Sequence, residues 1–457
     1  MISRRDLLRM ALAAAVGSRL TACSGEQGRD TLSPRSSLRE LLEAQARLVF
    51  ETNRVDAEIG LFHLPSAETY RSFFAWDSGW NVIALSLLDP ELAYQELKTV
   101  FQVQCEDGHV PHEVRVPGLG ETDPLRILTL LAVRRQYDRL GRSRFVDPPS
   151  FLIAAELLFR RTGDPRVLEL LPAMQRCVDY LLGPRDLFGD GLVAIIHPWE
   201  SGTDSAPVFD GPMGIDIRNP LVILDYLVKY PQLLNFCADL GWDTAAIADA
   251  NRFVFEDTGM NGVTAAGLMS MAFLYGAAGQ PAPSDRCRRR ASDMVRAMEA
   301  VMWDDQDGFF YPRYDRVHPR QSRRRCLSGV APLLTGLVEE EKALRLIEGA
   351  LLSGDHFAGA WLVPFNSIAE IEDRIPGEDM LLWRGHCIWA SMNWIAARAA
   401  AAYGRSDLAR RITRATAEML AAEGFREYYD SRTGRGMGAT GFTWPALVLD
   451  MIERYGL

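Results

Sequence analysis

The feature that most constrains this fold is a repeated junction at which one helical pattern ends at a glycine and another begins within a few residues. In LLFRRTGDPRVLELL, Gly163 is followed by Asp164 and Pro165. Glycine accepts the left-handed conformation that ends a helix, whereas Asp and Pro favour the first positions of the next one. The junction recurs at residues 241–243 and 404–406. Long alternation of apolar and polar residues, which marks half-buried strands, is missing, so the sequence predicts helical hairpins.

Long segments rich in Trp, Pro, Gly and acidic residues separate these hairpins. They cover residues 60–82, 104–122, 185–220, 303–325, 355–385 and 424–445. A solenoid would show a more regular repeat and plainer loops, so this alternation favours a closed (α/α)6 toroid with its long loops at one rim. We therefore expect an all-α fold whose single domain spans residues 37–457. The 48% hydrophobic content is sufficient for its core.

Residues 1–36 form a separate region. Arg4 and Arg5 precede a short apolar run, and Cys23 follows small residues. This arrangement resembles a twin-arginine export signal with a lipoprotein box, which implies removal of residues 1–22, acylation of Cys23 and a flexible tether over residues 23–36. It places the protein in the periplasm or cell envelope, with the membrane reached only through the lipid anchor. An ordinary amphipathic first helix is the alternative.

Charge and metal-ligand spacing exclude several classes of partner. The formal net charge is −10 and no basic stripe is present, so nucleic acid is not an expected partner. His109 and His112 lie three residues apart with no third ligand apparent, and the acidic run at 304–307 lacks the terminal Glu of a calcium loop. We therefore expect no metal site. The oligomeric state is left open.

The cysteines beyond Cys23 show no paired spacing that would indicate a disulfide framework. We interpret them as buried, reduced core residues. They are Cys105, Cys177, Cys237, Cys287, Cys326 and Cys387.

Four segments combine indole rings with acidic side chains. They are RSFFAWDSGWN, HPWESGTDSAP, LLWRGHCIWASMNW and FREYYDSRTGRGMGATGFTW. The apolar face of a sugar stacks on an aromatic ring, and carboxylates and Arg bind its hydroxyl groups. Cleavage of a glycosidic bond also requires two carboxyl groups. The segments therefore indicate a site that holds and cleaves a sugar.

Together and in this order, these motifs resemble glycoside hydrolase family 63, and within it the bacterial mannosylglycerate and glucosylglycerate hydrolases. The resemblance extends from about residue 60 to residue 450. It implies an inverting glycosidase that acts on a small α-glycoside without a cofactor, with Asp204 as general acid and Glu427 as general base. It further implies a substrate site lined by Trp76, Asp77, Trp199, Glu200, Gly202, Trp383, Arg384, Tyr428 and Trp444.

Several alternatives stay open. Asp204 could only cap a turn, and Glu427 could only pair with Arg426. Ser205 stands where the family motif has Asn, and residues 214–243 do not match a glycerate-binding segment. The sequence therefore leaves glucose or mannose specificity and the aglycone undecided.

Two other functions compete with hydrolysis. A non-catalytic glycan-binding lipoprotein would keep the Trp residues but tolerate loss of either carboxylate. A polysaccharide lyase on a similar toroid would release an unsaturated, ultraviolet-absorbing product. The motifs match hydrolases better than either.

Overall fold

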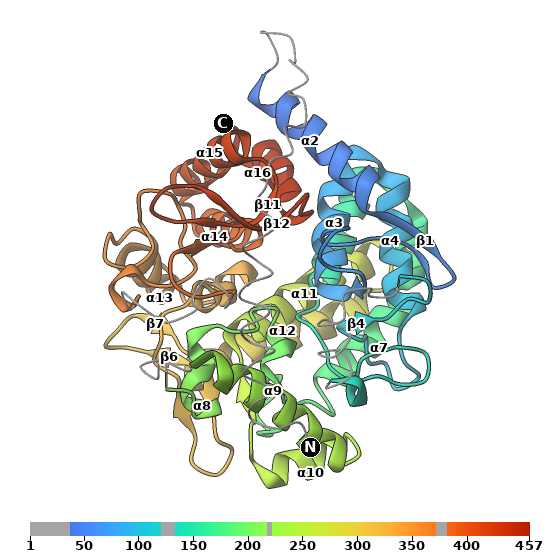
Figure 1. Ribbon diagram of the computed structural model, residues 1–457, viewed down its shortest axis with the longest axis vertical. Coiled ribbons are helices and arrows are strands. Elements are labelled where there is room, and N and C mark those ends of the chain that lie inside the picture. The colour runs from blue at the N-terminus through green and yellow to red at the C-terminus, as the bar shows by residue number, and fades with distance from the viewer. Residues whose placement is uncertain (1–36, 120–132, 217–221, 372–381) are drawn as a thin grey trace.

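A computed structural model describes residues 37–119, 133–216, 222–371 and 382–457 (Figure 1). The predicted signal, Cys23 and the tether lie outside these residues. The described α-helices are α2 (Leu38–Asn53), α3 (Ala75–Leu88), α4 (Pro90–Gln102), α6 (Ser150–Thr162), α7 (Leu171–Leu181), α8 (Asp210–Met213), α9 (Val222–Asp239), α10 (Thr244–Ala250), α11 (Thr258–Ala277), α12 (Pro281–Val301), α13 (Glu340–Leu346), α14 (Ala390–Ala402), α15 (Ser406–Glu423) and α16 (Val448–Tyr455). Short 3-10 or π segments are η1 (Arg134–Gln136), η2 (Pro165–Leu170), η3 (Pro198–Ser201), η4 (Pro207–Phe209), η5 (Leu327–Thr335), η6 (Ile347–Leu351), η7 (Ile368–Glu370) and η9 (Trp444–Leu447).

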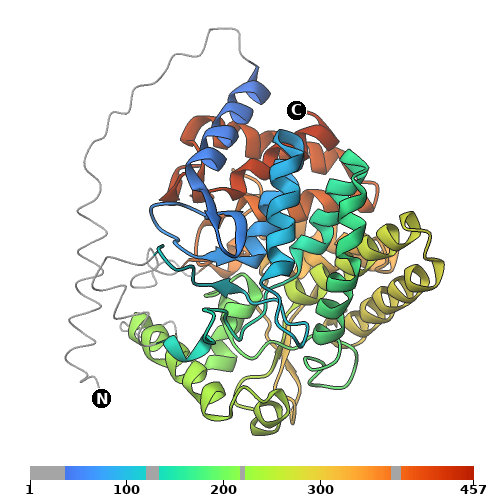
Figure 2. The same ribbon diagram turned by 90° about the vertical axis from the view of Figure 1, so that its right-hand side faces the viewer.

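The inner helical segments form a ring that closes on itself. α3 packs on α6, α6 on α11, α11 on η5, η5 on α14, and α14 on η9 and α16, which return to α3. α4, α12 and α15 pack outside their inner neighbours α3, α11 and α14. At the seam, α2 packs against α15 and α16, so the first and last described helices lie side by side in both ribbon views (Figures 1 and 2). The apolar faces of the inner segments therefore meet in one continuous core.

The hairpin junctions have the predicted chemistry. Gly163 ends α6 in the left-handed conformation, with φ of 65°, and the Asp164 side chain accepts a hydrogen bond from the Arg166 N–H. Asp243 caps α10 in the same way. The junction before α15 differs, because Arg405 occupies the N-cap position and Ser406 is already helical. Local capping preferences therefore account for most of these helix boundaries.

Short antiparallel strand pairs lie in the connecting loops. They are β1 (Arg54–Ala57) with β2 (Gly60–His63), β3 (Phe73–Phe74) with β4 (Glu113–Val114), β5 (Phe255–Glu256) with β8 (Arg313–Tyr314) and β9 (Arg320–Gln321), β6 (Trp303–Asp304) with β7 (Phe309–Phe310), and β10 (Cys387–Ile388) with β11 (Arg426–Asp430) and β12 (Gly436–Thr440). The predicted non-helical segment 60–82 is too long, because α3 begins at Ala75. These strands stiffen the loops, and the helices make the core.

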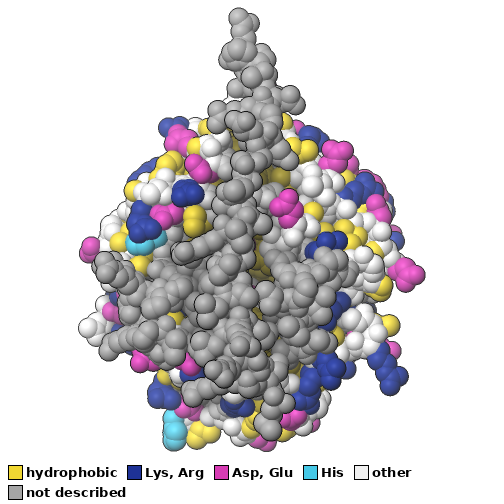
Figure 3. Space-filling view, viewed as in Figure 1, with side chains coloured by type: hydrophobic (Ala, Val, Ile, Leu, Met, Phe, Trp, Pro, Cys, Tyr) yellow, Lys and Arg dark blue, Asp and Glu magenta, His cyan; other side chains and the backbone are white. Residues whose placement is uncertain are grey.

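The cysteines of the described residues are free thiols, as the sequence predicts. The six predicted thiols are free; five are buried and Cys105 is partly exposed. No described helix is both long enough and apolar enough to cross a bilayer. On the face seen in Figure 3, the visible acidic and basic side chains are interspersed.

Candidate active site

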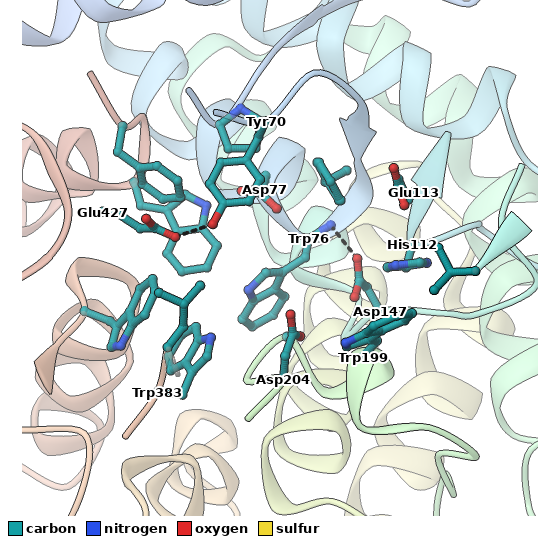
Figure 4. Close-up of a pocket in the computed structure, with 18 of the residues that line it drawn as sticks. Tyr70, Trp76, Asp77, His112, Glu113, Asp147, Trp199, Asp204, Trp383 and Glu427 are labelled. Atoms are coloured by element: carbon teal, nitrogen blue, oxygen red, sulfur yellow. Dashed lines mark hydrogen bonds between the residues drawn. The ribbon is translucent and has the colours of Figure 1, made fainter. Parts of the chain in front are cut away.

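A cavity of about 300 Å³ opens where inner segments begin. Trp76 is the second residue of α3, Asp147 precedes α6, Trp389 is the N-cap of α14, and Trp444 starts η9. The cavity is lined by Pro65, Tyr70, Phe74, Trp76, Asp77, His112, Glu113, Val133, Gln136, Tyr137, Asp147, Trp199, Gly202, Asp204, Leu382, Trp383, Trp389, Glu427, Phe442 and Trp444, most of which are drawn in Figure 4. One rim of the ring thus carries a pocket that combines indole rings with carboxyl groups.

Glu427 is aimed into the cavity by an irregularity in β11. The register of β11 against β12 shifts between Arg426 and Tyr428, as in a β-bulge, which redirects the side chain between them. The Tyr70 hydroxyl donates a hydrogen bond to Oε1 of Glu427, and the Ala439 N–H donates one to Oε2 at 2.8 Å. Burial raises the pKa of Glu427, while these two donors oppose the rise. Glu427 is therefore a fixed carboxylate with one face toward the cavity.

Asp204 lies on a different side of the cavity from Glu427 (Figure 4). The Tyr230 hydroxyl donates to the backbone carbonyl of Asp204 at 2.7 Å, which anchors the loop and leaves the side chain to face the pocket. Burial raises the pKa of Asp204 to about 7, and the charge of Glu427 adds to the rise. A carboxyl group with this pKa carries a proton over much of the neutral range and can donate it.

Two further acidic residues lie near Asp204. Burial raises the pKa of Asp77 to about 8, with a contribution from Asp204. Asp147 accepts a hydrogen bond from the Trp76 N–H at 3.2 Å, and burial, followed by the charge of Asp77, raises its pKa well above the usual range. These raised pKa values favour the protonated form, in which a carboxyl group can both donate to and accept from sugar hydroxyl groups.

Stacked aromatic rings form the opposite wall. The Trp383 and Trp389 rings are parallel within 8° with centroids 3.8 Å apart, and Trp444 lies against both. Tyr428 stacks on Trp389 at 5.3 Å. A flat apolar wall of this kind binds the face of a pyranose.

Gly202 sets the position of Trp76. Its φ is +68°, and a Cβ there would lie 2.9 Å from two atoms of the Trp76 ring. Only glycine allows both the left-handed backbone and this close approach. The HPWESGTDSAP loop, which carries Asp204, therefore packs directly on the Trp76 indole of α3.

The structure brings most of the proposed substrate residues to the cavity: Trp76, Asp77, Trp199, Gly202, Trp383 and Trp444 line it together with Asp204 and Glu427. Glu200, Arg384 and Tyr428, which we expected there, are not among the lining residues. Glu200 is fully buried in a bidentate ion pair with Arg185, at 2.6 and 2.9 Å, and also accepts from the backbone N–H groups of Val146 and Ile196. It fixes the loop from behind.

Arg384 also lies away from the cavity, contrary to the expectation from the sequence. Its Nη2 contacts Asp210 and the hydroxyl of Tyr226, and the side chain is buried. Tyr428 supports the ring of Trp389 rather than lining the pocket. In each case a partner distant in sequence determines the direction of the side chain.

Sequence reasoning missed six polar residues of the cavity: Tyr70, His112, Glu113, Gln136, Tyr137 and Asp147. The Tyr137 hydroxyl donates to Glu113, which repeats the arrangement of Tyr70 and Glu427 at another part of the wall. Asp147 stands directly before two prolines, in a segment that holds Phe145 but no indole ring. Only the DGHVPHE segment gave a hint, because it includes Glu113.

Known proteins resemble this chain over most of its length. Residues 70–445 match the family described as mannosylglycerate hydrolase MGH1-like glycoside hydrolase domain. A mannosylglycerate hydrolase from Thermus thermophilus is 28% identical over 417 residues, covering 85% of this chain and 95% of that protein. A glucosylglycerate hydrolase from Mycolicibacterium hassiacum is 24% identical over 86% of this chain and 95% of its own.

Solved structures agree with this grouping. The crystal structure of a family 63 mannosylglycerate hydrolase from Thermus thermophilus, in complex with Tris and D-glycerate, superimposes with a TM-score of 0.76 at 27% identity, covering 90% of this chain and all of that one. A neutral trehalase from Saccharomyces cerevisiae, at 17% identity and a TM-score of 0.54, covers 89% of this chain and 79% of its own, and shares the fold. The fold is a helical toroid.

Proposed function

The chain belongs to the MGH1-like glycoside hydrolase family, as its four motifs predicted, and we propose that this glycosidase is an inverting hydrolase of a small α-glycoside. Asp204 is the general acid and Glu427 is the general base. The observation that carries the assignment is the pair itself: two cavity carboxyl groups on different sides of one pocket, in environments that differ.

The environments suit opposite roles. Asp204, with a pKa of about 7, donates its proton to the glycosidic oxygen as the bond to the anomeric carbon breaks. Glu427, held by Tyr70 and Ala439, accepts a proton from water, whose oxygen attacks the opposite face of the anomeric carbon. Inverting enzymes separate their two carboxyl groups by about 6.5–9.5 Å to admit this water. The products are the free aglycone alcohol and a sugar of inverted configuration.

The aromatic wall supports the sugar part of the assignment. Trp383, Trp389 and Trp444 offer a stacking face, while Asp77 and Asp147 offer groups that exchange hydrogen bonds with hydroxyls. The related enzymes are named for mannosylglycerate and glucosylglycerate. These two compounds are therefore the first substrates to test, followed by small α-linked disaccharides.

Proton NMR of the reacting mixture tests the mechanism, because the anomeric protons distinguish the first-formed sugar before mutarotation. We expect the non-reducing sugar of glucosylglycerate, mannosylglycerate, kojibiose or nigerose to appear first as the β-anomer, and we expect trehalose to give α- and β-glucose in equal amounts. Asp204→Asn should be silent, whereas Asp56→Asn, an exposed Asp in the β1–β2 hairpin, should behave as the parent. If α-sugar appears first, the acid and base roles are wrong.

Two finer points belong to the same proposal. The closed ring of helical segments supports a six-hairpin (α/α)6 arrangement. The N-terminal motif supports export to the cell envelope with acylation at Cys23. Radiolabelled palmitate incorporated into the parent but not into Cys23→Ser tests the anchor.

A further inference from the structure

The tight turn that leaves α4 gathers three different metal-ligating side chains. Cys105, Asp107 and His109 each offer one ligand atom, and these atoms lie within 4.8 Å of one another. The Cys105 N–H donates to the His109 carbonyl at 2.8 Å, and the Gly108 N–H donates to the Cys105 carbonyl at 3.0 Å. This pairing puts residues 105 and 109 opposite each other. We propose that the turn binds one divalent transition metal of the zinc class through Cys105, Asp107 and His109, with solvent as the fourth ligand.

The imidazole of His109 has a fixed orientation. Its Nε2 lies 2.9 Å from the Phe145 carbonyl, which can only accept, so Nε2 carries the proton. The remaining nitrogen, Nδ1, therefore has its lone pair available for a metal. The ring also stacks on Tyr180, with centroids 5.3 Å apart. A ligand histidine whose other nitrogen binds a backbone carbonyl is the usual arrangement around protein-bound zinc.

The backbone of the turn is rigid before any metal arrives. Gly108 has φ of +94°, and a Cβ there would lie 2.4 Å from the Arg176 carbonyl oxygen, so no other residue fits. Gln104 ties the turn to α7 by donating to the carbonyls of Gly108 at 2.9 Å and Ala173 at 3.0 Å. Preformed ligand geometry lowers the entropy cost of binding a metal.

Asp107 has one oxygen to spare. Oδ1 accepts a hydrogen bond from the His109 N–H at 3.0 Å, which leaves Oδ2 for a metal. Tetrahedral zinc, with bonds of about 2.0–2.3 Å, needs its ligand atoms closer together than 4.8 Å. The side chains of Asp107 and Cys105 supply that adjustment, because Asp107 is exposed and Cys105 is only partly buried.

The charge and the donor set favour a zinc-class ion. The soft thiolate and the borderline imidazole outnumber the one hard carboxylate, and such a set suits zinc or cobalt better than magnesium or calcium. The guanidinium groups of Arg142 and Arg144 lie near Cys105; Arg142 is ion-paired with Asp138 at 2.8 Å, and the Asp107 carboxylate opposes the charge of Arg144. The turn can therefore take a cation.

A metal bound at this turn would stabilise one wall of the cavity. The Phe145 carbonyl that orients His109 also accepts from the N–H of His112, at 2.9 Å, and His112 lines the cavity beside Glu113 on β4. A metal at the turn thus ties the segment that follows α4 to His112 and to β4, which begins at Glu113. Its role is to stabilise the wall, and the hydrolytic chemistry does not need it.

Cobalt titration of the full-length chain, reduced and freed of metal with a chelator, tests the proposal. We expect one equivalent of Co²⁺ to produce a thiolate-to-cobalt band in the near ultraviolet and ligand-field bands of four-coordinate strength, both abolished by excess Zn²⁺. Cys105→Ser should remove the thiolate band, and Asp107→Asn, which loses a charged ligand, should weaken cobalt affinity at least about 10-fold. Glu106→Gln, in the same turn, is the matched control and should keep the parent's affinity.

Thermal unfolding with and without Zn²⁺ separates ligand loss from misfolding. Zn²⁺ should raise the Tm of the parent and of Glu106→Gln but not of Cys105→Ser or Asp107→Asn, whose metal-free Tm should stay near that of the parent. A thiolate band that persists in Cys105→Ser would place the cobalt at another cysteine and overturn the proposal. Absence of a one-equivalent band in the parent would overturn it as well.

Discussion

The hydroxyl of Tyr70 donates a hydrogen bond to Oε1 of Glu427, joining residues 357 positions apart in the chain. Tyr70 lies in the loop between β2 and β3, and Glu427 lies at the irregular point of β11. The bond crosses the seam where the two ends of the ring meet. It fixes the carboxylate proposed as the base, and it opposes the rise that burial causes in the pKa of Glu427.

Replacing Tyr70 by Phe should therefore lower kcat and move the acid limb of the pH profile to higher pH. A hydrogen bond to a charged group contributes about 1.5–3 kcal/mol, which corresponds to roughly 10–100-fold in rate. Steady-state kinetics from about pH 4 to 9 measure both effects. Tyr137→Phe removes the corresponding hydroxyl from Glu113 and should leave that limb in place. An unshifted limb in Tyr70→Phe would argue against Glu427 as the base.

Gly438→Ala should displace Glu427 without unfolding the protein. A Cβ at residue 438 would lie 2.4 Å from Oε2 of Glu427. Displacing a reacting group by about 1 Å can cost on the order of 100-fold in rate. Gly441→Ala is the matched control, because its φ of +57° is also left-handed but nothing lies within 4 Å of the added Cβ. Equal loss of kcat in both variants would assign the effect to backbone strain alone.

The pH dependence of kcat/KM should be bell-shaped. Asp204 must be protonated to act as acid, so activity should fall as pH rises through about 7. Glu427 must be ionised to act as base, so activity should fall on the acid side, at a pH above the ordinary value for Glu because burial raises its pKa. Because the charges of Asp204 and Glu427 interact, the apparent pKa values of the two limbs belong to the pair and not to either residue alone. A profile that is flat from about pH 6 to 9 would contradict Asp204 as the acid.

Asp77→Asn should change how stability depends on pH. An Asp in the unfolded chain has an ordinary pKa of about 3.9, whereas folded Asp77 keeps its proton up to about pH 8 because burial raises its pKa. Between these values the folded state binds more protons, so its stability falls as pH rises. The Tm gain of Asp77→Asn over the parent should therefore be larger at about pH 8 than at about pH 4, with about 1 °C for each kcal/mol in a domain of this size. Asp56→Asn should show no such trend, and calorimetry at both pH values measures it.

Glu200→Gln should damage stability more than chemistry. It leaves Arg185 charged and fully buried without its counter-ion, which costs about 3–5 kcal/mol. Glu91→Gln breaks an exposed Glu–Arg pair and should cost less than about 1 kcal/mol. Urea unfolding compares the two variants. If Glu200→Gln loses activity while its free energy of unfolding equals that of the parent, Glu200 contacts the substrate.

The sequence determined what depends on neighbours in the chain. A glycine ends one helix and the cap that follows it starts the next, through hydrogen bonds that span only two to four residues. The roles of Gly163, Asp164 and Asp243 could therefore be predicted without knowing the fold. The four motifs, matched as a set, also located both cavity carboxyl groups that we assign to catalysis.

Tertiary structure decided which side chains of those motifs reach the cavity. Glu200 is adjacent to Trp199, yet Arg185 and two backbone N–H groups hold it behind the wall, and Arg384 turns to Asp210, 174 residues away. Tyr70 and Asp147 enter the site only because the ring closes and the helix starts converge. A loop side chain is free to point either way until a distant partner satisfies its charge, and that partner is not encoded in the local sequence.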